Sequence, residues 1–197
     1  MTGSVVGPDG RRRCPWGLSA PDYVAYHDEE WGRPITDDNG IFERLTLEAF
    51  QSGLSWLTIL RKRPSFRAAF AGFDIASVAA FGPLDRERLL GDAGIVRNRA
   101  KIDAALTNAR AALDVDGGLA ALVWGYAPKP RRAPRALADV PSQTDESKAL
   151  AKELRRRGFA FVGPTTLYAL MQAAGLVNDH LRDCWARDRV QEEVTAP

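Results

Sequence analysis

The cysteine and histidine residues of this sequence lie in two short segments near opposite ends of the chain. Twelve residues separate Cys14 from His27, and three separate His180 from Cys184. Two thiolates and two imidazoles form a complete tetrahedral ligand set for zinc, and the chain contains no other cysteine or histidine. Because four protein ligands leave no open coordination position, we expect one structural zinc ion that joins the two ends of the chain.

Two other interpretations of these four residues stay open. Free cysteines are often small buried hydrophobes, and single histidines often form ordinary hydrogen bonds, in which case there is no metal site. A disulfide between Cys14 and Cys184 would leave both histidines unexplained, and nothing marks the chain for an oxidising compartment. The restriction of every cysteine and histidine to these two segments favours zinc.

Aromatic residues gather around the first two expected ligands, and a carboxylate is expected beside them. They are Trp16, Tyr23, Tyr26, Trp31 and, shortly after, Trp56. Aromatic residues usually form core, but their polar edges also suit a slot for a flat, electron-poor ring. On a helical wheel, Glu48 lies beside Leu45 on the apolar face, whereas Glu43 lies on the opposite, solvent side. Since an isolated buried carboxylate is costly, Glu48 needs a partner, a cation or a ligand.

Composition and length indicate a globular protein that needs no disulfides. With 197 residues, 45% of them hydrophobic, the chain can bury a sizeable core. The net charge of +2 does not by itself indicate nucleic-acid binding, although short basic clusters permit a phosphate-facing side. No apolar run approaches the roughly 20 residues of a membrane span, and no signal peptide is visible. We expect a cytoplasmic protein with one domain at 14–185 and flexible tails at 1–13 and 186–197.

Helical periodicity recurs along the chain while strand signals are nearly absent, which predicts an all-α fold. The expected helices cover residues 38–53, 83–91, 98–113, 144–157, 164–175 and 179–185. The last of these would place His180 and Cys184 on one helical face, because they are four residues apart. Four prolines between positions 125 and 141 predict an ordered crossing segment instead of a helix.

A turn at residues 92–96 gives about residues 84–113 the layout of a helix-hairpin-helix. Its glycine permits a tight turn, and backbone N–H groups there and at the next helix N-terminus can hold a DNA phosphate without reading sequence. The residues expected at the DNA are Gly94, Ile95, Arg97, Arg99 and Lys101. A plain turn between two helices would have a similar sequence, so both interpretations stay open.

Several separated segments closely resemble the DNA-3-methyladenine glycosylase I family, within the helix-hairpin-helix DNA glycosylase superfamily. They are CPWG at 14–17, YVAYHDEEWG at 23–32, LEAFQSGLSW at 47–56, DAGI at 92–95, RGFAFVG at 157–163 and GLVNDH at 175–180. The likeness covers about residues 14–185. It implies a helix-hairpin-helix glycosylase fold, a structural zinc ion on Cys14, His27, His180 and Cys184, and release of 3-methyladenine from alkylated DNA.

The resemblance also implies roles for individual residues. Glu48 and Tyr26 would hydrogen-bond the damaged base, Trp56 would stack on it, and Tyr23, Trp16 and Trp31 would complete the pocket wall. Gly53 and Leu54 would enter the gap left in the duplex, although Leu54 could instead be core. Methylation at N3 makes adenine a cationic leaving group, so selective capture can dominate the chemistry.

The expected enzyme is therefore a monofunctional glycosylase. Water would complete the hydrolysis without a Schiff base, which leaves an abasic site in an unbroken backbone. Its partners would be double-stranded DNA that contains alkylated bases and free 3-methyladenine as product, with no membrane partner. We expect a monomer.

Other candidates stay open. Asp114 or Asp116 could act as the catalytic carboxylate found in many helix-hairpin-helix glycosylases, although the family resembled here is thought to lack that residue and residues 116–118 suit a turn. A non-catalytic zinc-stabilised DNA lesion-binding module would keep the hairpin but would not need Glu48 beside an aromatic slot. A zinc hydrolase or deaminase would need an open coordination site, which a fourth protein ligand removes.

Overall fold

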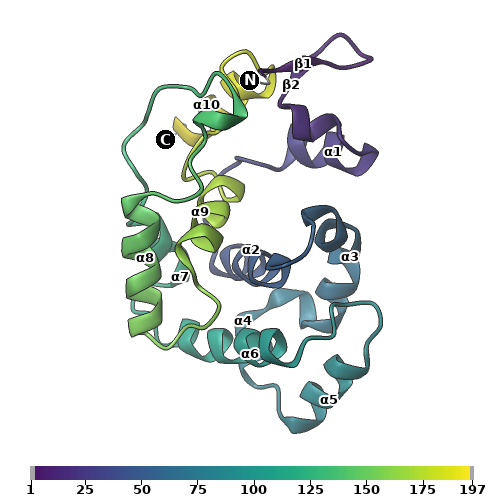
Figure 1. The fold of residues 1–197 in the computed structure, drawn as a ribbon. Helices are drawn as coiled ribbons and strands as arrows, with labels where there is room; N and C mark the ends of the chain where they lie inside the picture. The colour runs from purple at the N-terminus through teal and green to yellow at the C-terminus, as the bar shows by residue number, and fades with distance from the viewer. Residues whose placement is uncertain (1–2, 196–197) are drawn as a thin grey trace.

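The computed structural model describes residues 3–195, in which α-helices surround a central helix and a small β-hairpin lies at the N-terminal end (Figure 1). The helices are α1 Pro21–Glu29, α2 Asp38–Gln51, α3 Trp56–Ala69, α4 Ile75–Ala79, α5 Pro83–Gly91, α6 Arg99–Leu113, α7 Leu119–Trp124, α8 Asp145–Arg156, α9 Pro164–Ala173 and α10 Ala186–Thr195. Short 3₁₀ turns cover η1 Pro15–Leu18, η2 Ala71–Phe73 and η3 Leu137–Asp139. The expected all-α class is confirmed. Within the described part of the chain, no helix is long and apolar enough to cross a lipid bilayer.

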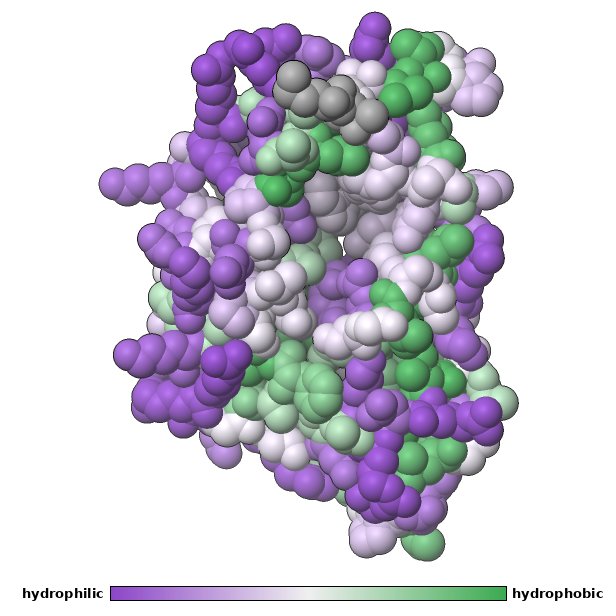
Figure 2. Space-filling view, in the orientation of Figure 1, coloured by the Kyte–Doolittle hydropathy of each residue, from purple (hydrophilic) through white to green (hydrophobic). Residues whose placement is uncertain are grey.

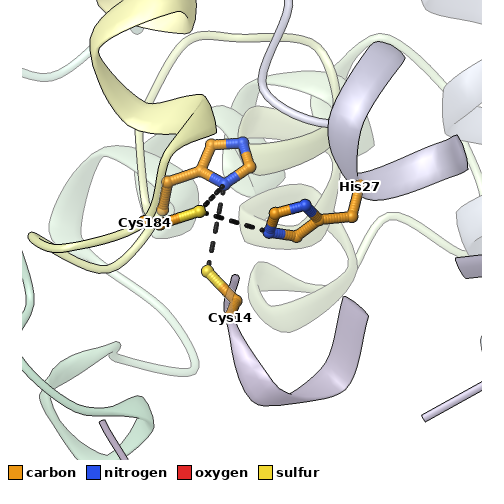
Figure 3. Close-up of side chains that lie close together, drawn as sticks. Cys14, His27 and Cys184 are labelled. Carbon is orange, nitrogen blue, oxygen red and sulfur yellow. Dashed lines mark hydrogen bonds between the residues drawn. The ribbon is translucent and has the colours of Figure 1, made fainter. Parts of the chain in front are cut away.

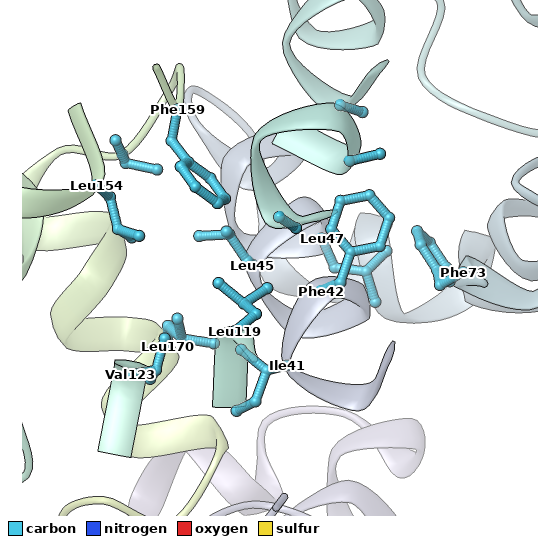
Figure 4. Packing of buried hydrophobic residues seen from close by; sticks show 14 of the residues in the cluster. Ile41, Phe42, Leu45, Leu47, Phe73, Leu119, Val123, Leu154, Phe159 and Leu170 are labelled. Carbon is cyan, nitrogen blue, oxygen red and sulfur yellow. The ribbon is translucent and has the colours of Figure 1, made fainter. Parts of the chain in front are cut away.

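Helix α2 is the central element of the core. It packs against α3, α6, α7 and α9, and Ile41, Phe42 and Leu45 on it are fully buried. Figure 4 shows its side chains meeting those of α7, α8 and α9, with Phe73 near Phe42 on the other side. Full burial of each such side chain contributes about 1.5 to 3 kcal/mol. Because α2 is enclosed on most sides, the polar residues it carries are buried as well, and Glu48 is one of them.

Side-chain caps mark the starts of three of the expected helices. Asn98 and Thr144, where two of these helices were expected to begin, cap α6 and α8, each accepting a backbone N–H three residues on. The cap of α2 is Asp37, which accepts the N–H of Gly40 at 2.7 Å. Asp38, where the sequence-based prediction starts this helix, instead accepts the N–H of Ala120 at 2.7 Å. It therefore links the N-terminus of α2 to that of α7.

The segment that carries the last two expected ligands is not a helix, which corrects the prediction for residues 179–185. His180 and Cys184 lie in successive turns instead of on a helical face. Hydrogen bonds from the first turn of α10 hold this segment: the Arg187 side chain donates to the carbonyls of Asn178 at 2.9 Å and His180 at 2.6 Å. These contacts and the convergence on Cys14, which accepts the N–H of Leu181 at 3.3 Å, outweigh the local helical pattern.

Both segments expected to be flexible tails contain secondary structure. Strands β1 Val5–Val6 and β2 Arg12–Arg13 pair antiparallel, and Arg13 is buried, with its guanidinium 2.7 Å from both Asp9 and Asp28. At the other end, α10 buries Val190. Residues 1–2 and 196–197 of the expected tails lie outside the described residues. Helices α1, α3, α4 and α7 were also not predicted.

Two connecting segments are ordered by contacts with helices. The proline-rich residues 125–141 contain only the η3 turn, as predicted. The loop at 157–163, between α8 and α9, is held by Asn108 of α6, which is buried. The Asn108 side chain donates to the carbonyl of Ala160 at 3.0 Å and accepts its N–H at 2.7 Å. This pair of bonds attaches the loop to the helix that follows the hairpin turn.

We expect Asn108→Ala to lower the free energy of unfolding by about 2 to 3 kcal/mol, because both polar groups of Ala160 would lose their partner. Urea unfolding monitored by circular dichroism measures the change. Thr107→Ala, at the exposed neighbouring position on α6, is the matched control and should change stability by less than about 0.5 kcal/mol. Equal losses in the two variants would contradict the role assigned to Asn108.

Candidate functional site

A pocket of about 490 Å³ opens between α1, α2, α9 and the η3 turn. Figure 2 shows the hollow in the middle of this face of the molecule. The residues that line it are Trp16, Ser19, Tyr23, Tyr26, Trp31, Glu48, Gln51, Trp56, Leu137, Val140, Ala169, Gln172 and Asp179. All the aromatic residues expected to form the slot, and Glu48, therefore line one pocket. The wall opposite, from Leu137 to Asp179, was not predicted, because its residues are distant in sequence from the aromatic residues and only Asp179 lies in one of the motifs.

The aromatic rings of the pocket hold one another in place. The centroid of Trp16 lies 5.8 Å from that of Tyr23 and 5.0 Å from that of Trp31, both in edge-to-face geometry. Tyr26 and Trp56 are 5.5 Å apart with a tilt of 45°. Edge contacts between rings leave ring faces available to a ligand. A flat aromatic molecule, especially a cationic one, suits such a wall.

Glu48 brings an unpartnered carboxyl group to this wall. Glu48 is 6% exposed, and no group in the described part of the chain donates a hydrogen bond to its side chain. Burial raises the pKa of Glu48 from 4.5 to about 8, and the charge of Arg44 opposes that rise. The helical-wheel prediction that Glu48 borders the interior is confirmed. Glu43, on the other side of α2, is only half-buried and pairs with Arg67 at 2.8 Å.

Tyr26 stands beside Glu48 as a neutral hydroxyl. Its residue is 3% exposed, and burial holds the pKa of its phenol well above the ordinary range. A neutral phenol can both donate and accept a hydrogen bond. Together, a carboxyl, a hydroxyl and several ring faces can bind a planar, positively charged heterocycle.

Cys14, His27, His180 and Cys184 converge next to the pocket, as the sequence predicts. Their ligand atoms all lie within 4.8 Å of one another, and all four residues are buried. The Cys184 sulfur is 3.5 Å from His27 Nε2 and 3.5 Å from His180 Nδ1, and the Cys14 sulfur is 3.9 Å from His180 Nδ1 (Figure 3). A tetrahedral ion with sulfur at about 2.3 Å and nitrogen at about 2.0 Å places these atoms about 3.5 Å apart. The cluster can therefore hold a metal ion.

The outer hydrogen bonds of both imidazoles leave the inner nitrogens ready to bind a cation. His27 Nδ1 lies 2.7 Å from Asp28 Oδ1, and His180 Nε2 lies 3.1 Å from the carbonyl oxygen of Trp31. Each outer nitrogen therefore carries the proton, and the nitrogen facing the cluster has a free lone pair. Burial raises the pKa of Asp28, but hydrogen bonds from Arg13 and His27 outweigh this effect and lower the pKa below its ordinary value. This keeps Asp28 an anionic acceptor.

The metal cluster and the pocket share their supporting elements. Tyr26 and His27 are consecutive residues of α1, one in the pocket and the other in the cluster. Trp31 lines the pocket, while its ring centroid lies 4.7 Å from that of His180. Fixing the cluster therefore also fixes one wall of the pocket.

The loop between α2 and α3 presents Gly53 and Leu54 at the surface. Gly53 has a φ of +79°, which favours glycine, and Leu54 is 41% exposed. The alternative that Leu54 is core is therefore excluded. Pocket residues Gln51 and Trp56 flank the loop, so an apolar side chain projects close to the pocket.

The residues expected at the DNA from the hairpin divide into two groups. Arg97 and Arg99 are exposed, whereas Ile95 is 2% exposed and packs in the core. Lys101 is also buried, and its ammonium donates to the carbonyls of Phe50 at 2.8 Å and Ser52 at 2.5 Å. Lys101 thus supports the C-terminal end of α2, below the Gly53–Leu54 loop. This placement differs from the surface position expected for it.

The hairpin turn itself is tightly packed. A Cβ added to Gly94 would lie 3.0 Å from the Cβ of Ser65, and Lys62 donates to the carbonyls of Ala93 at 2.9 Å and Gly94 at 3.1 Å. The glycine is therefore required by close approach to α3.

The alternative carboxylates lie elsewhere. Asp114 and Asp116 are exposed in the turn after α6, and neither lines the pocket. Two carboxyl groups line the pocket, Glu48 and Asp179. Asp179 accepts hydrogen bonds from Arg131, Tyr168 and Gln172, so Glu48 is the one whose oxygens are left for a ligand.

The raised pKa of Glu48 predicts a stability change with pH. Folding favours its protonated form, so the stability that this group contributes is present below its ordinary pKa of 4.5 and is lost as the pH rises through about 8. Glu48→Gln should therefore be more stable than the wild type at about pH 9, by about 2 to 4 kcal/mol, and nearly equal at about pH 5. Urea unfolding across this range measures the difference, with Glu43→Gln as the control that should show no gain. Parallel pH curves for wild type and Glu48→Gln would refute the assignment.

Comparisons with known proteins agree with this geometry. A sequence model of the family described as methyladenine glycosylase matches residues 16–187. The DNA-3-methyladenine glycosylase 1 of Escherichia coli (strain K12) is 47% identical over 177 residues, which cover 87% of this chain and 95% of the relative. A crystal structure of 3-methyladenine DNA glycosylase I superposes with a TM-score of 0.84 at 47% identity, covering 88% of this chain and 98% of the other. A structure describing 3-methyladenine recognition by the Staphylococcus aureus enzyme superposes with a TM-score of 0.84 at 35% identity, covering 89% and 96%. The chain belongs to the methyladenine glycosylase family.

Proposed function

We propose that this protein is a monofunctional base-excision glycosylase that releases 3-methyladenine from alkylated DNA. Relatives at 47% and 43% identity are named as glycosylases of this base. The observation that carries the proposal is the buried Glu48 carboxyl, which has no donor of its own and faces an aromatic pocket. A pocket of this kind gains most from a planar cation.

Selectivity then follows from the charge of the damaged base. Methylation at N3 gives adenine a positive charge, which can approach the Glu48 carboxylate and the face of Trp56. Each stacking contact contributes about 1 to 3 kcal/mol, and the charge adds a cation–π term. Normal adenine is neutral, so it recovers less of the cost of leaving the duplex. Capture of the flipped cation supplies the discrimination.

Hydrolysis needs little further assistance. A cationic base is a good leaving group, and water can attack the sugar as the glycosidic bond breaks. Among the described residues that line the pocket there is no lysine to form a Schiff base. The product would be an abasic site in an intact strand, with free 3-methyladenine released.

The surface around the pocket suits double-stranded DNA. Leu54 can enter the gap left by the flipped nucleotide, as apolar wedges do in other DNA-binding proteins. The exposed Arg97 and Arg99, near the glycine turn and the start of α6, can contact phosphates. Lys101 does not reach the DNA but supports the Gly53–Leu54 loop, because its ammonium donates to the carbonyls at the C-terminal end of α2. One copy of the chain contains all these elements, so a monomer is sufficient.

We further propose that the four-residue cluster holds one zinc ion with a structural role. Two thiolates and two imidazoles match the ligand preference and tetrahedral spacing of zinc. When bound, the ion supplies a fixed tie between the segment at 14–27 and the turns at 180–184. With four protein ligands, it has no position for an attacking water, which argues against a zinc hydrolase or deaminase.

Glu48→Gln should fold normally but excise 3-methyladenine about 10-fold to 100-fold more slowly, because a charge-assisted contact worth about 1.5 to 3 kcal/mol is lost. The measurement is single-turnover release of free 3-methyladenine from methylated duplex DNA. Glu43→Gln, on the opposite face of α2, should retain nearly full activity. If Glu48→Gln matches the wild-type rate, Glu48 has no part in base capture; DNA binding without any base release by the wild type would instead favour a lesion-binding module.

The zinc proposal predicts one equivalent of zinc per chain by plasma mass spectrometry. Cys184→Ala should remove the ion and lower the melting temperature by at least about 10 °C, because binding of a structural zinc is coupled to folding. Asp183→Ala, at the exposed neighbouring position, controls for local disturbance and should keep the metal. A metal-free wild type of unchanged melting temperature would contradict the structural role.

A further inference from the structure

A second charged residue of α2, Arg44, lies one turn before Glu48 and is 6% exposed. Its Nη2 donates to Glu30 Oε2 at 2.9 Å, whereas its Nη1 is buried and has no hydrogen-bond partner among residues 3–195. A buried guanidinium nitrogen without a partner is costly, so its presence calls for a compensating electrostatic role. Arg44 does not line the pocket, and therefore it cannot serve by touching a ligand.

The charge of Arg44 is only partly neutralised by Glu30. Glu30 also accepts hydrogen bonds from Arg63 at 2.5 and 2.8 Å, so two guanidinium groups share one carboxylate. Burial raises the pKa of Glu30, but hydrogen bonds from Arg63 and Arg44 outweigh this effect and lower the pKa to about 2. Glu30 is therefore anionic. Arg63, Glu30 and Arg44 thus form a cluster with one more positive than negative charge, and Arg44 lies one turn before Glu48 on α2.

Among the described residues, the other cations near this side of the pocket are Arg63 and Arg131, and both are paired with carboxylates. The titratable and charged groups here are Tyr23 and Tyr26 from α1, Glu30 just after α1, Arg44 from α2, Arg63 from α3, Arg131 from the segment between α7 and α8, Tyr168 from α9 and Asp179 after α9. Tyr26 is neutral, and the guanidinium carbon of Arg44 lies 5.6 Å from its ring centroid. Asp179 accepts hydrogen bonds from Tyr168 at 2.6 Å, Gln172 at 2.9 Å and Arg131 at 2.5 Å. Arg131 is therefore paired with Asp179 and Arg63 with Glu30, which leaves Arg44.

We propose that Arg44 is a positioning residue for base capture: from behind the pocket wall, the charge of its guanidinium favours the ionised form of the Glu48 carboxyl, which is the form that a cationic base needs. Arg44 forms no ion pair with Glu48 in the described structure, so the carboxylate oxygens stay free for the ligand. Because Glu30 draws the guanidinium away from the pocket, the cationic base does not meet a second cation at its binding surface. The use of this charge in base capture rests on the proposed function.

The charge state of Glu48 can be measured without any ligand. In protein labelled with ¹³C at the glutamate carboxyl carbon, the Glu48 resonance is identified by its loss in Glu48→Gln, and its titration midpoint is read by NMR. Arg44→Met, which keeps the length and removes the charge, should raise the midpoint by about 1 to 2 pH units, and Arg44→Lys should restore most of the wild-type value. Arg67→Met, which breaks the exposed pair with Glu43, is the matched control and should leave the midpoint unchanged.

Excision rates give the functional half of the test. Arg44→Met should lower the single-turnover rate at neutral pH about 10-fold, and the deficit should shrink as the pH rises and Glu48 ionises. A purely structural role would lower the rate equally at every pH and would leave the Glu48 midpoint in place. An unshifted midpoint in Arg44→Met overturns the proposal.

A second variant keeps the proposal testable if Arg44→Met does not fold. Glu30→Gln releases Arg44 from its competing carboxylate, so the Glu48 midpoint should fall, and an unchanged or raised midpoint overturns the proposal.

The outcomes of these experiments also separate the role of Arg44 from the proposed function. If the midpoint shifts as expected while Glu48→Gln excises at the wild-type rate, base capture by Glu48 fails and so does the use assigned to Arg44. If Glu48→Gln is impaired but Arg44→Met leaves the midpoint unmoved, only the role of Arg44 fails.

Discussion

The cost of burying the Glu48 carboxyl governs how this molecule can work. The group sits on the central helix α2, where burial raises its pKa to about 8 and no protein donor compensates it. A protein keeps such a group only where something else recovers the cost, and a cationic ligand in an aromatic pocket does so. In the proposed function, the pocket therefore gains affinity from the positive charge that distinguishes an alkylated base from a normal one. The same charge makes that base easy to release.

The four-residue cluster gives the pocket its fixed shape. Helix α1 is only 9 residues long and would be marginal alone. It carries Tyr26 into the pocket and His27 into the cluster, so a tie at the cluster immobilises the ring. Asp28 and Arg13 extend the hydrogen-bond network outward to the N-terminal β-hairpin. The proposed metal ion and the proposed base pocket are thus linked through adjacent residues of one helix.

Buried polar residues of the central helices support the site from behind. Lys101 holds the carbonyls at the end of α2, below the loop that presents Leu54. Arg44 faces Glu48 from within the same helix, and its charge opposes the effect of burial on the pKa of Glu48. Neither residue lines the pocket. Side chains that never meet the ligand therefore set both the electrostatics of the pocket and the position of the surface loop.

The sequence by itself determined the chemistry-bearing residues and the approximate bounds of α2, α5, α6, α8 and α9. The set of two cysteines and two histidines, the aromatic residues and the helical-wheel position of Glu48 all depend on residue identity and local spacing. Only the tertiary structure decided which residues turn inward and how the ends of the chain are organised. Lys101 and Ile95 are buried, the segment at His180 is a series of turns, and the expected tails form a hairpin and a helix. The reason is physical: these outcomes depend on hydrogen bonds and packing between residues far apart in sequence, and such contacts outweigh local propensity.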